Sequence, residues 1–191
     1  MSPSARALLI STSGTVALDQ VSKALVRANL RPPPAIDEVV IIPNYLSIAH
    51  AINKGAAFSA MADYEHRLLV FFAFTAVAVA MVGIAYRKLA PDDALLSAAL
   101  GTLLGGALGN FIDRLWAGQV TDMIKVYAGS EPAKSWCREH FGTSVWPIFN
   151  VADMAIWIGV IGFLLAYLLV KDRSAEAASS SMPGESQPTL D

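Results

Sequence analysis

Two long uncharged segments constrain this chain more than any other feature. Residues 68–86 and 94–112 each run for 19 residues without a charged side chain, close to the ~20 apolar residues that a helix needs to cross a bilayer. The polar linker at 87–93 is short, so the two helices are expected to form an antiparallel hairpin. Charged residues make up only 16% of the chain, whereas soluble domains hold about 25%. The sequence therefore predicts an integral membrane protein.

Two further spans are predicted on either side of this hairpin. Residues 149–170 are apolar except for two polar residues near their start. Residues 7–26 form the weakest span, because Asp19 and Lys23 interrupt its apolar pattern. These two residues are four apart, so they share a helix face and can pair, and a paired, inward-facing charge is tolerated in a membrane helix. We therefore expect a membrane all-α fold of four transmembrane helices.

The connections suggest a small extramembrane β element and a flexible tail. Four spans place both termini on one side and the loops 28–67 and 113–148 on the other. The first loop contains VVII, Pro-Asn and AINKGAAFSA, a pattern typical of short strands. The start of the chain lacks a small-residue cleavage site and is interpreted as a retained first helix. The predicted organisation is one membrane domain at 1–173 and a disordered, Ser- and Ala-rich tail at 174–191.

Several classes of function find no support in the composition or motifs. The net charge of -2 does not indicate a nucleic-acid partner. The lone Cys137 offers neither a disulfide nor metal-ligand spacing. No HExxH motif is present, and GTSVW around Ser144 is not the GxSxG of a serine hydrolase. We therefore expect no metal and no cofactor. Basic residues occur on both sides of the predicted helices, so charge alone leaves the orientation open.

The polar residues that carry chemistry gather where helices meet the loops. Asn110, Asp113 and Arg114 follow the third apolar segment, and Asp153 begins the last one. Ionisable groups at such a depth are costly and usually functional. Asp122 and Asp153 are the pair that we single out, because two adjacent carboxylates separate their pKa values. The ionised member can take a proton from water while the protonated member donates to a scissile carbonyl. A structural role as helix caps is the alternative.

Four segments in order make the interpretation specific. They are DQVSK at 19–23, NKGAAFS at 53–59, GGALGNFIDRLWAGQVTDM at 105–123 and FNVAD at 149–153. Together they closely resemble the lipoprotein signal peptidases, the type II signal peptidases of bacteria. The resemblance covers nearly the whole chain from the first helix to the fourth. Two residues depart from the family pattern, Met123 in place of phenylalanine and Met154 in place of a small polar residue, and both changes are conservative.

The resemblance implies a fold, a reaction and a site. It implies four membrane helices with a β-rich cradle, and an aspartic endopeptidase that removes the signal peptide of diacylglyceryl-modified prolipoproteins before the lipidated cysteine. Asp122 and Asp153 match the catalytic aspartates. The residues that match the polar, substrate-binding surround are Asp19, Lys23, Asn53, Asn110, Arg114 and Asn150. The implied location is the bacterial cytoplasmic (inner) membrane, with both termini cytoplasmic and the site facing outward. Lipid-modified precursors and membrane lipids are the implied partners.

Two other functions stay open from the residues alone. One is a different intramembrane aspartic peptidase, such as a prepilin-type or presenilin-like enzyme, against which FNVAD and NKGAAFS argue. The other is a non-enzymatic transporter or channel subunit that uses buried charges for ions. No inverted repeat supports the second alternative.

Overall fold

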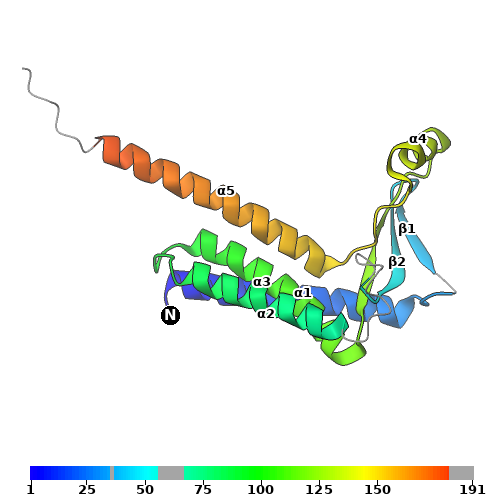
Figure 1. Ribbon diagram of the computed structural model, residues 1–191, viewed down its shortest axis with the longest axis horizontal. Coiled ribbons are helices and arrows are strands. Elements are labelled where there is room, and N and C mark those ends of the chain that lie inside the picture. The colour runs from blue at the N-terminus through cyan, green and yellow to red at the C-terminus, as the bar shows by residue number, and fades with distance from the viewer. Residues whose placement is uncertain (35–36, 56–66, 181–191) are drawn as a thin grey trace, which may run out of the picture.

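The computed structural model describes residues 1–34, 37–55 and 67–180, and only the backbone of 67 and of 169–180. Eight elements follow one another along these ranges. They are α1 (Pro3–Asn29), β1 (Glu38–Ile42), β2 (Leu46–Asn53), α2 (Arg67–Tyr86), α3 (Ala94–Ala117), β3 (Val120–Val126), α4 (Glu131–Phe141) and α5 (Val151–Ser180). Four long helices form a bundle, and a small sheet with α4 lies at one end of it (Figure 1). The N-terminus and the far end of α5 both lie at the opposite end, where α5 diverges from the other helices (Figure 1).

Three of the described helices are long and apolar enough to cross a membrane. They are α2 at Leu68–Tyr86, α3 at Ala94–Ala117 and α5 at Val151–Leu168. This confirms a multi-pass membrane protein. The predicted fourth span, α1, is not confirmed: it is 27 residues long, but the charged side chains of Asp19, Lys23 and Arg27 interrupt its second half.

Helix α3 lies at the centre of the bundle, and its glycines allow α1 and α5 to approach closely. A Cβ atom added to Gly105 would lie 2.6 Å from the Cβ atom of Thr15 in α1, and one added to Gly106 would meet the backbone oxygen of Ala152 in α5. Small residues therefore give α3 two packing faces, one for each neighbour.

The sheet is antiparallel with the order β1-β2-β3. The VVII strand predicted from the sequence is β1, and it pairs with β2 through Val39 and Ile48. β2 pairs with β3, where Ala51 stands opposite Asp122. β3 was not predicted from the sequence, in which its residues fall within the expected loop at 113–148. The rest of the predicted strand region, from residue 56 on, lies outside the described residues.

Several helix boundaries differ from the predicted ones. α3 continues five residues beyond 112 to Ala117, and Gly118 then ends it with φ of 67°, a left-handed conformation that favours glycine at a helix C-terminus. α5 begins at Val151 and continues to Ser180, so the helix extends seven residues into the segment predicted as disordered. Residues 181–191 lie outside the described ranges, and the domain boundary at 173 stays a prediction.

Candidate active site

Asp153 is held by the first turn of α5. Asn150 precedes the helix and accepts a hydrogen bond from the backbone N–H of Asp153 to its Oδ1 atom at 3.0 Å. In return, the backbone N–H of Asn150 donates to Asp153 Oδ2 at 3.2 Å. This reciprocal pair is a capping box, which satisfies two N–H groups that a helix start leaves free. The structural role suggested for this aspartate is therefore present, and it fixes the direction of the carboxylate.

A third backbone N–H group at the start of α5 has its hydrogen-bond acceptor in α1. The backbone N–H of Ala152 donates to Asp19 Oδ1 at 2.9 Å. Carboxylates are stabilised at a helix N-terminus because the peptide dipoles leave positive charge there. Asp19 thus ties α1 to the first turn of α5, next to Asp153.

Asp122 reaches the same place from the middle of β3. It is 2% exposed, and each of its carboxylate oxygens accepts an amide hydrogen. Asn53 Nδ2 donates to Asp122 Oδ2 at 2.8 Å, and Asn150 Nδ2 donates to Asp122 Oδ1 at 2.6 Å. Asn53 comes from the end of β2, so the antiparallel pairing of β2 and β3 brings donor and acceptor together.

Asn110 of α3 links the two carboxylates: it bonds directly to Asp153 and reaches Asp122 through Asn150. Its Nδ2 atom donates to Asp153 Oδ1 at 2.8 Å. Its Oδ1 atom accepts from Asn150 Nδ2 at 3.1 Å and from Lys23 Nζ at 3.0 Å. Asn110 and Asn150 are 6% and 0% exposed. Each aspartate is therefore oriented by buried amides, without a direct bond between the two being required.

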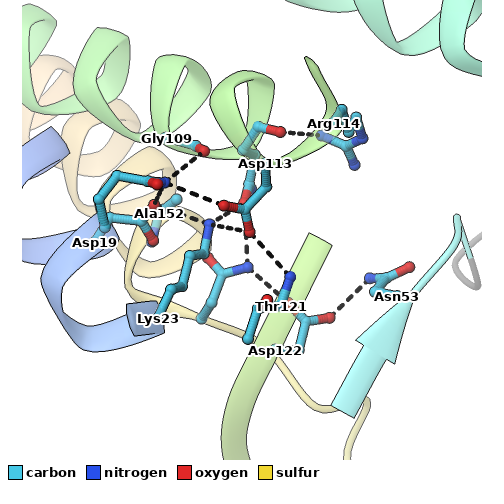
Figure 2. A network of polar contacts seen from close by, with 12 residues as sticks. Asp19, Lys23, Asn53, Gly109, Asp113, Arg114, Thr121, Asp122 and Ala152 are labelled. Carbon is cyan, nitrogen blue, oxygen red and sulfur yellow. Dashed lines mark hydrogen bonds and ion pairs between the residues drawn. The ribbon is translucent and has the colours of Figure 1, made fainter. Parts of the chain in front are cut away.

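Asp19, Lys23 and Asp113 form a buried ion cluster (Figure 2), which contacts Asn110 through Lys23. Lys23 Nζ is 2.8 Å from Asp19 Oδ2 and 3.3 Å from Asp113 Oδ2. Lys23 and Asp19 are fully buried. Asp113 Oδ2 also accepts the backbone N–H of Thr121 at 3.0 Å, and Arg27 Nη1 donates to Thr121 Oγ1 at 3.1 Å. Charges from α1 and α3 thereby fix the residue that precedes Asp122.

The two aspartates open onto a common cleft of about 710 Å³. Asn53 and Arg114 also line it, and the rest of its wall is mostly apolar, with Phe71, Trp146 and Trp157 among the larger side chains. The Arg114 guanidinium lies 4.1 Å from the centre of the Phe71 ring, a cation–π contact. The cleft therefore presents a few polar and charged groups among mostly apolar side chains.

The environment of Asp122 favours a proton. Burial raises the pKa of its carboxyl group to about 6, and the negative charge of Asp153 adds to the increase, while hydrogen bonds from Asn53 and Asn150 oppose it. Two neighbouring carboxyl groups of which one binds its proton more tightly can act as acid and base in one reaction. Among the described residues, no cluster of three or more His, Cys, Asp or Glu side chains could hold a metal ion.

The predicted site residues take three positions. Asp122, Asp153, Asn53 and Arg114 line the cleft, and Asn110 and Asn150 orient the aspartates from behind. Asp19 and Lys23, predicted among the substrate-binding residues, are fully buried behind Asn110. Their position indicates support of the site and not contact with a substrate.

Sequence reasoning missed two contributors to the site. Asp113 was noted but not assigned to the site, although its place three residues after Asn110, on the same helix face, was an available signal. Phe71, which carries the Arg114 contact, had no such signal, because it lies in a uniformly apolar helix.

Residues 12–169 match the family model of signal peptidase (SPase) II. The chain belongs to the signal peptidase II family. Among similar signal peptidase II proteins, the lipoprotein signal peptidase of Geobacter metallireducens is 36% identical over 177 residues, which cover 93% of this chain and 98% of that protein. That of Syntrophotalea carbinolica is 38% identical over 161 residues, which cover 84% and 90%.

Two solved structures resemble this signal peptidase II family member in fold. Both are described as bacterial membrane enzyme structures by the in meso method, at 1.9 and 2.3 Å resolution. Each is 28% identical, with TM-scores of 0.67 and 0.66. The first match covers 84% of this chain and 92% of the other, and the second covers 94% of both. Membership of this family rejects the transporter alternative and the other aspartic peptidase families.

Proposed function

We propose that this protein is a lipoprotein signal peptidase whose catalytic residues are Asp122 and Asp153. It removes the signal peptide of diacylglyceryl-modified prolipoproteins by cutting before the lipidated cysteine. One observation carries the assignment: two carboxyl groups from distant segments, β3 and α5, line the same cleft and are each fixed by buried amides. Family membership supports the reaction, because relatives at 36–38% identity are named lipoprotein signal peptidases.

The chemistry needs one proton on the pair. The ionised carboxylate takes a proton from a water molecule, which attacks the scissile carbonyl carbon, and the protonated carboxyl donates to the carbonyl oxygen. The proton taken from water then moves to the leaving amine as the peptide bond breaks, and a hydroxyl group of the tetrahedral intermediate returns a proton to the other carboxylate, which restores the pair. The two carboxyl groups titrate as a unit, so the roles are assigned to the pair.

The shape of the cleft suits a substrate that arrives from the bilayer. One wall is formed by Ile156 and Trp157 of α5, and Trp157 is 68% exposed on a membrane-spanning helix. Asn53 and Arg114 provide polar groups for an extended substrate backbone, whose N–H and C=O groups would otherwise lie unpaired near lipid.

We place α1 as a fourth span. Its charged residues Asp19 and Lys23 are turned inward and fully buried, whereas Ile10, Leu18 and Val21 are more than half exposed. An apolar outer face with paired inner charges suits a helix in lipid. Four spans agree with termini at one end of the bundle (Figure 1). We assign that end to the cytoplasm and the cleft to the outer face of the bacterial cytoplasmic membrane, as the family resemblance implies.

The decisive experiment is cleavage of a purified diacylated precursor by the wild type and by the Asp122→Asn and Asp153→Asn variants. Both variants should insert into the membrane and lose cleavage. Asp92→Asn, an exposed aspartate in the turn before α3, is the matched control and should cleave normally. Unmodified precursor should remain uncut by all four proteins. Cleavage by either dyad variant at the wild-type rate would reject the assignment.

A further inference from the structure

Helix α4 presents large aromatic side chains that the described part of the chain does not cover. None of its residues is buried. Trp136 and Phe141 are 53% and 69% exposed. The Trp136 ring stacks on His140 with centroids 4.5 Å apart and meets Phe141 edge-on at 5.6 Å. These contacts hold the aromatic groups together as one surface.

The residues of α4 separate into two faces. At 100° per residue, one face contains Pro132, Ala133, Trp136, Cys137 and His140, with Phe141 at its margin. The opposite face contains Glu131, Lys134, Ser135, Arg138 and Glu139. A helix with one apolar, Trp-containing face and one charged face is typical of a helix that lies in the membrane interface.

The place of α4 at the end of the bundle, on the side of α5, puts this helix close to the membrane surface. The strands run across the axes of the long helices, and α4 lies beyond their far end, on the side of the bundle where α5 lies (Figure 1). α5 is long and apolar enough to cross the membrane over Val151–Leu168, and its first turns expose Trp157 and Ile158 at 68% and 58%. The space beside these residues is therefore bilayer, and α4 lies near its surface.

We propose that α4 docks its aromatic face on the bilayer surface next to the cleft. Trp136 and Phe141 enter the headgroup boundary, where amphipathic aromatic rings are favoured, while Lys134 and Arg138 on the other face stay in water. Trp146, which follows α4, lines the cleft itself. Docking of α4 would thus hold the side of the cleft that α5 forms close to the bilayer surface.

The lone cysteine provides a direct test. Cys137 is the only cysteine in the chain and lies on the aromatic face, so a nitroxide label can be attached without other changes. The full-length labelled protein is placed in phosphatidylcholine–phosphatidylglycerol vesicles, and collisions with oxygen and with a water-soluble nickel chelate are measured. The matched control carries the label at position 135 on the opposite face, in the variant Ser135→Cys combined with Cys137→Ser.

Docking on lipid predicts frequent oxygen collisions and few nickel collisions at Cys137, with the reverse at position 135. In the Trp136→Ser/Phe141→Ser background, nickel collisions at Cys137 should rise toward the control value. Frequent nickel collisions at Cys137 in the wild-type background would overturn the proposal in favour of a water-facing helix. Few collisions with either reagent would overturn it in favour of a protein partner. The label is read without substrate, so the result does not depend on the roles of Asp122 and Asp153.

Discussion

Asn150 donates a hydrogen bond of 2.6 Å from its side-chain Nδ2 atom to Asp122 Oδ1. The same side chain accepts the backbone N–H of Asp153 at 3.0 Å through its oxygen. One amide at the start of α5 therefore positions both candidate catalytic residues. The cap of a helix and the geometry of the dyad are a single structural feature.

Asn150→Ala should reduce kcat more than it raises KM. The substitution removes the hydrogen bond to Asp122 and the cap of α5, and a bond to a charged group contributes about 1.5–3 kcal/mol. If this loss falls on the transition state, kcat decreases roughly 10- to 100-fold. Steady-state cleavage of a diacylated precursor measures it. Asn29→Ala, at an exposed side chain that bonds among the described residues only to Leu25 O, should behave as wild type. A wild-type kcat in Asn150→Ala would contradict the positioning role.

The pH dependence of kcat/KM should report the shared proton. The pKa of Asp122 is raised to about 6, chiefly by burial, so below pH 6 its carboxyl group holds a proton in the free enzyme. As the pH rises through about 6, Asp122 loses this proton, and the pair no longer carries the proton that the carbonyl oxygen needs. We expect kcat/KM to fall over this range. A profile that rises through pH 6 would contradict the proposed sharing.

Asn53→Ala should move this descending limb to higher pH. Asn53 Nδ2 donates to Asp122 at 2.8 Å and thereby stabilises the charged carboxylate, which lowers its pKa. Without this bond the protonated form is favoured, so the pKa of Asp122 increases above 6. The comparison of pH profiles for the variant and the wild type measures the shift. A limb that stays in place or moves to lower pH would show that Asn53 does not stabilise the charge.

Lys23→Met should strongly destabilise the protein. It leaves Asp19 and Asp113 with 0% and 4% exposure without their ammonium partner, and removal of one member of a buried pair costs about 3–5 kcal/mol. Thermal unfolding in detergent should show a clearly lower midpoint. Lys134→Met removes a surface pair with Glu131, which is 83% exposed, and should change the midpoint little. Equal unfolding midpoints for the two variants would show that the buried ion cluster does not stabilise the fold.

Gly109→Ala should loosen the contact between α1, α3 and α5. An added Cβ would lie 2.5 Å from Asp19 Oδ2 and 3.3 Å from Ala152 Cβ, and such overpacking costs about 1–3 kcal/mol. Gly83→Ala is the control, because a Cβ there meets nothing within 4 Å and alanine favours a helix by roughly 1 kcal/mol. The two variants should therefore shift the unfolding midpoint in opposite directions.

Removal of residues 174–191 should leave kcat/KM unchanged. Among the side chains that the structure describes, those lining the cleft extend no further than Trp157, and the tail composition does not support a packed core. Cleavage by the full chain and by the shortened protein provides the comparison. A loss of cleavage with normal insertion would assign the tail a role in the reaction.

Local patterns along the chain were enough to predict the membrane class, the hairpin of α2 and α3 and the ordered motifs of the family. These follow from properties that are local along the chain: a long uncharged run needs lipid, and a motif is read in its own residues. The spacing of Asp19 and Lys23 likewise predicted their pairing, which the structure confirms at 2.8 Å.

Which polar residues line the cleft and which support it from the interior depends on the packing of the folded chain. β3 was missed because a strand that carries Thr121 and Asp122 depends on pairing with β2 and on the Asp113 bond to Thr121, which local propensity does not encode. Asp19 and Lys23 match the same family pattern as Asn53 and Arg114, yet they are buried behind Asn110. Burial and hydrogen-bond partners are set by the close approach of α1, α3 and α5, and distant segments meet only once the chain has folded.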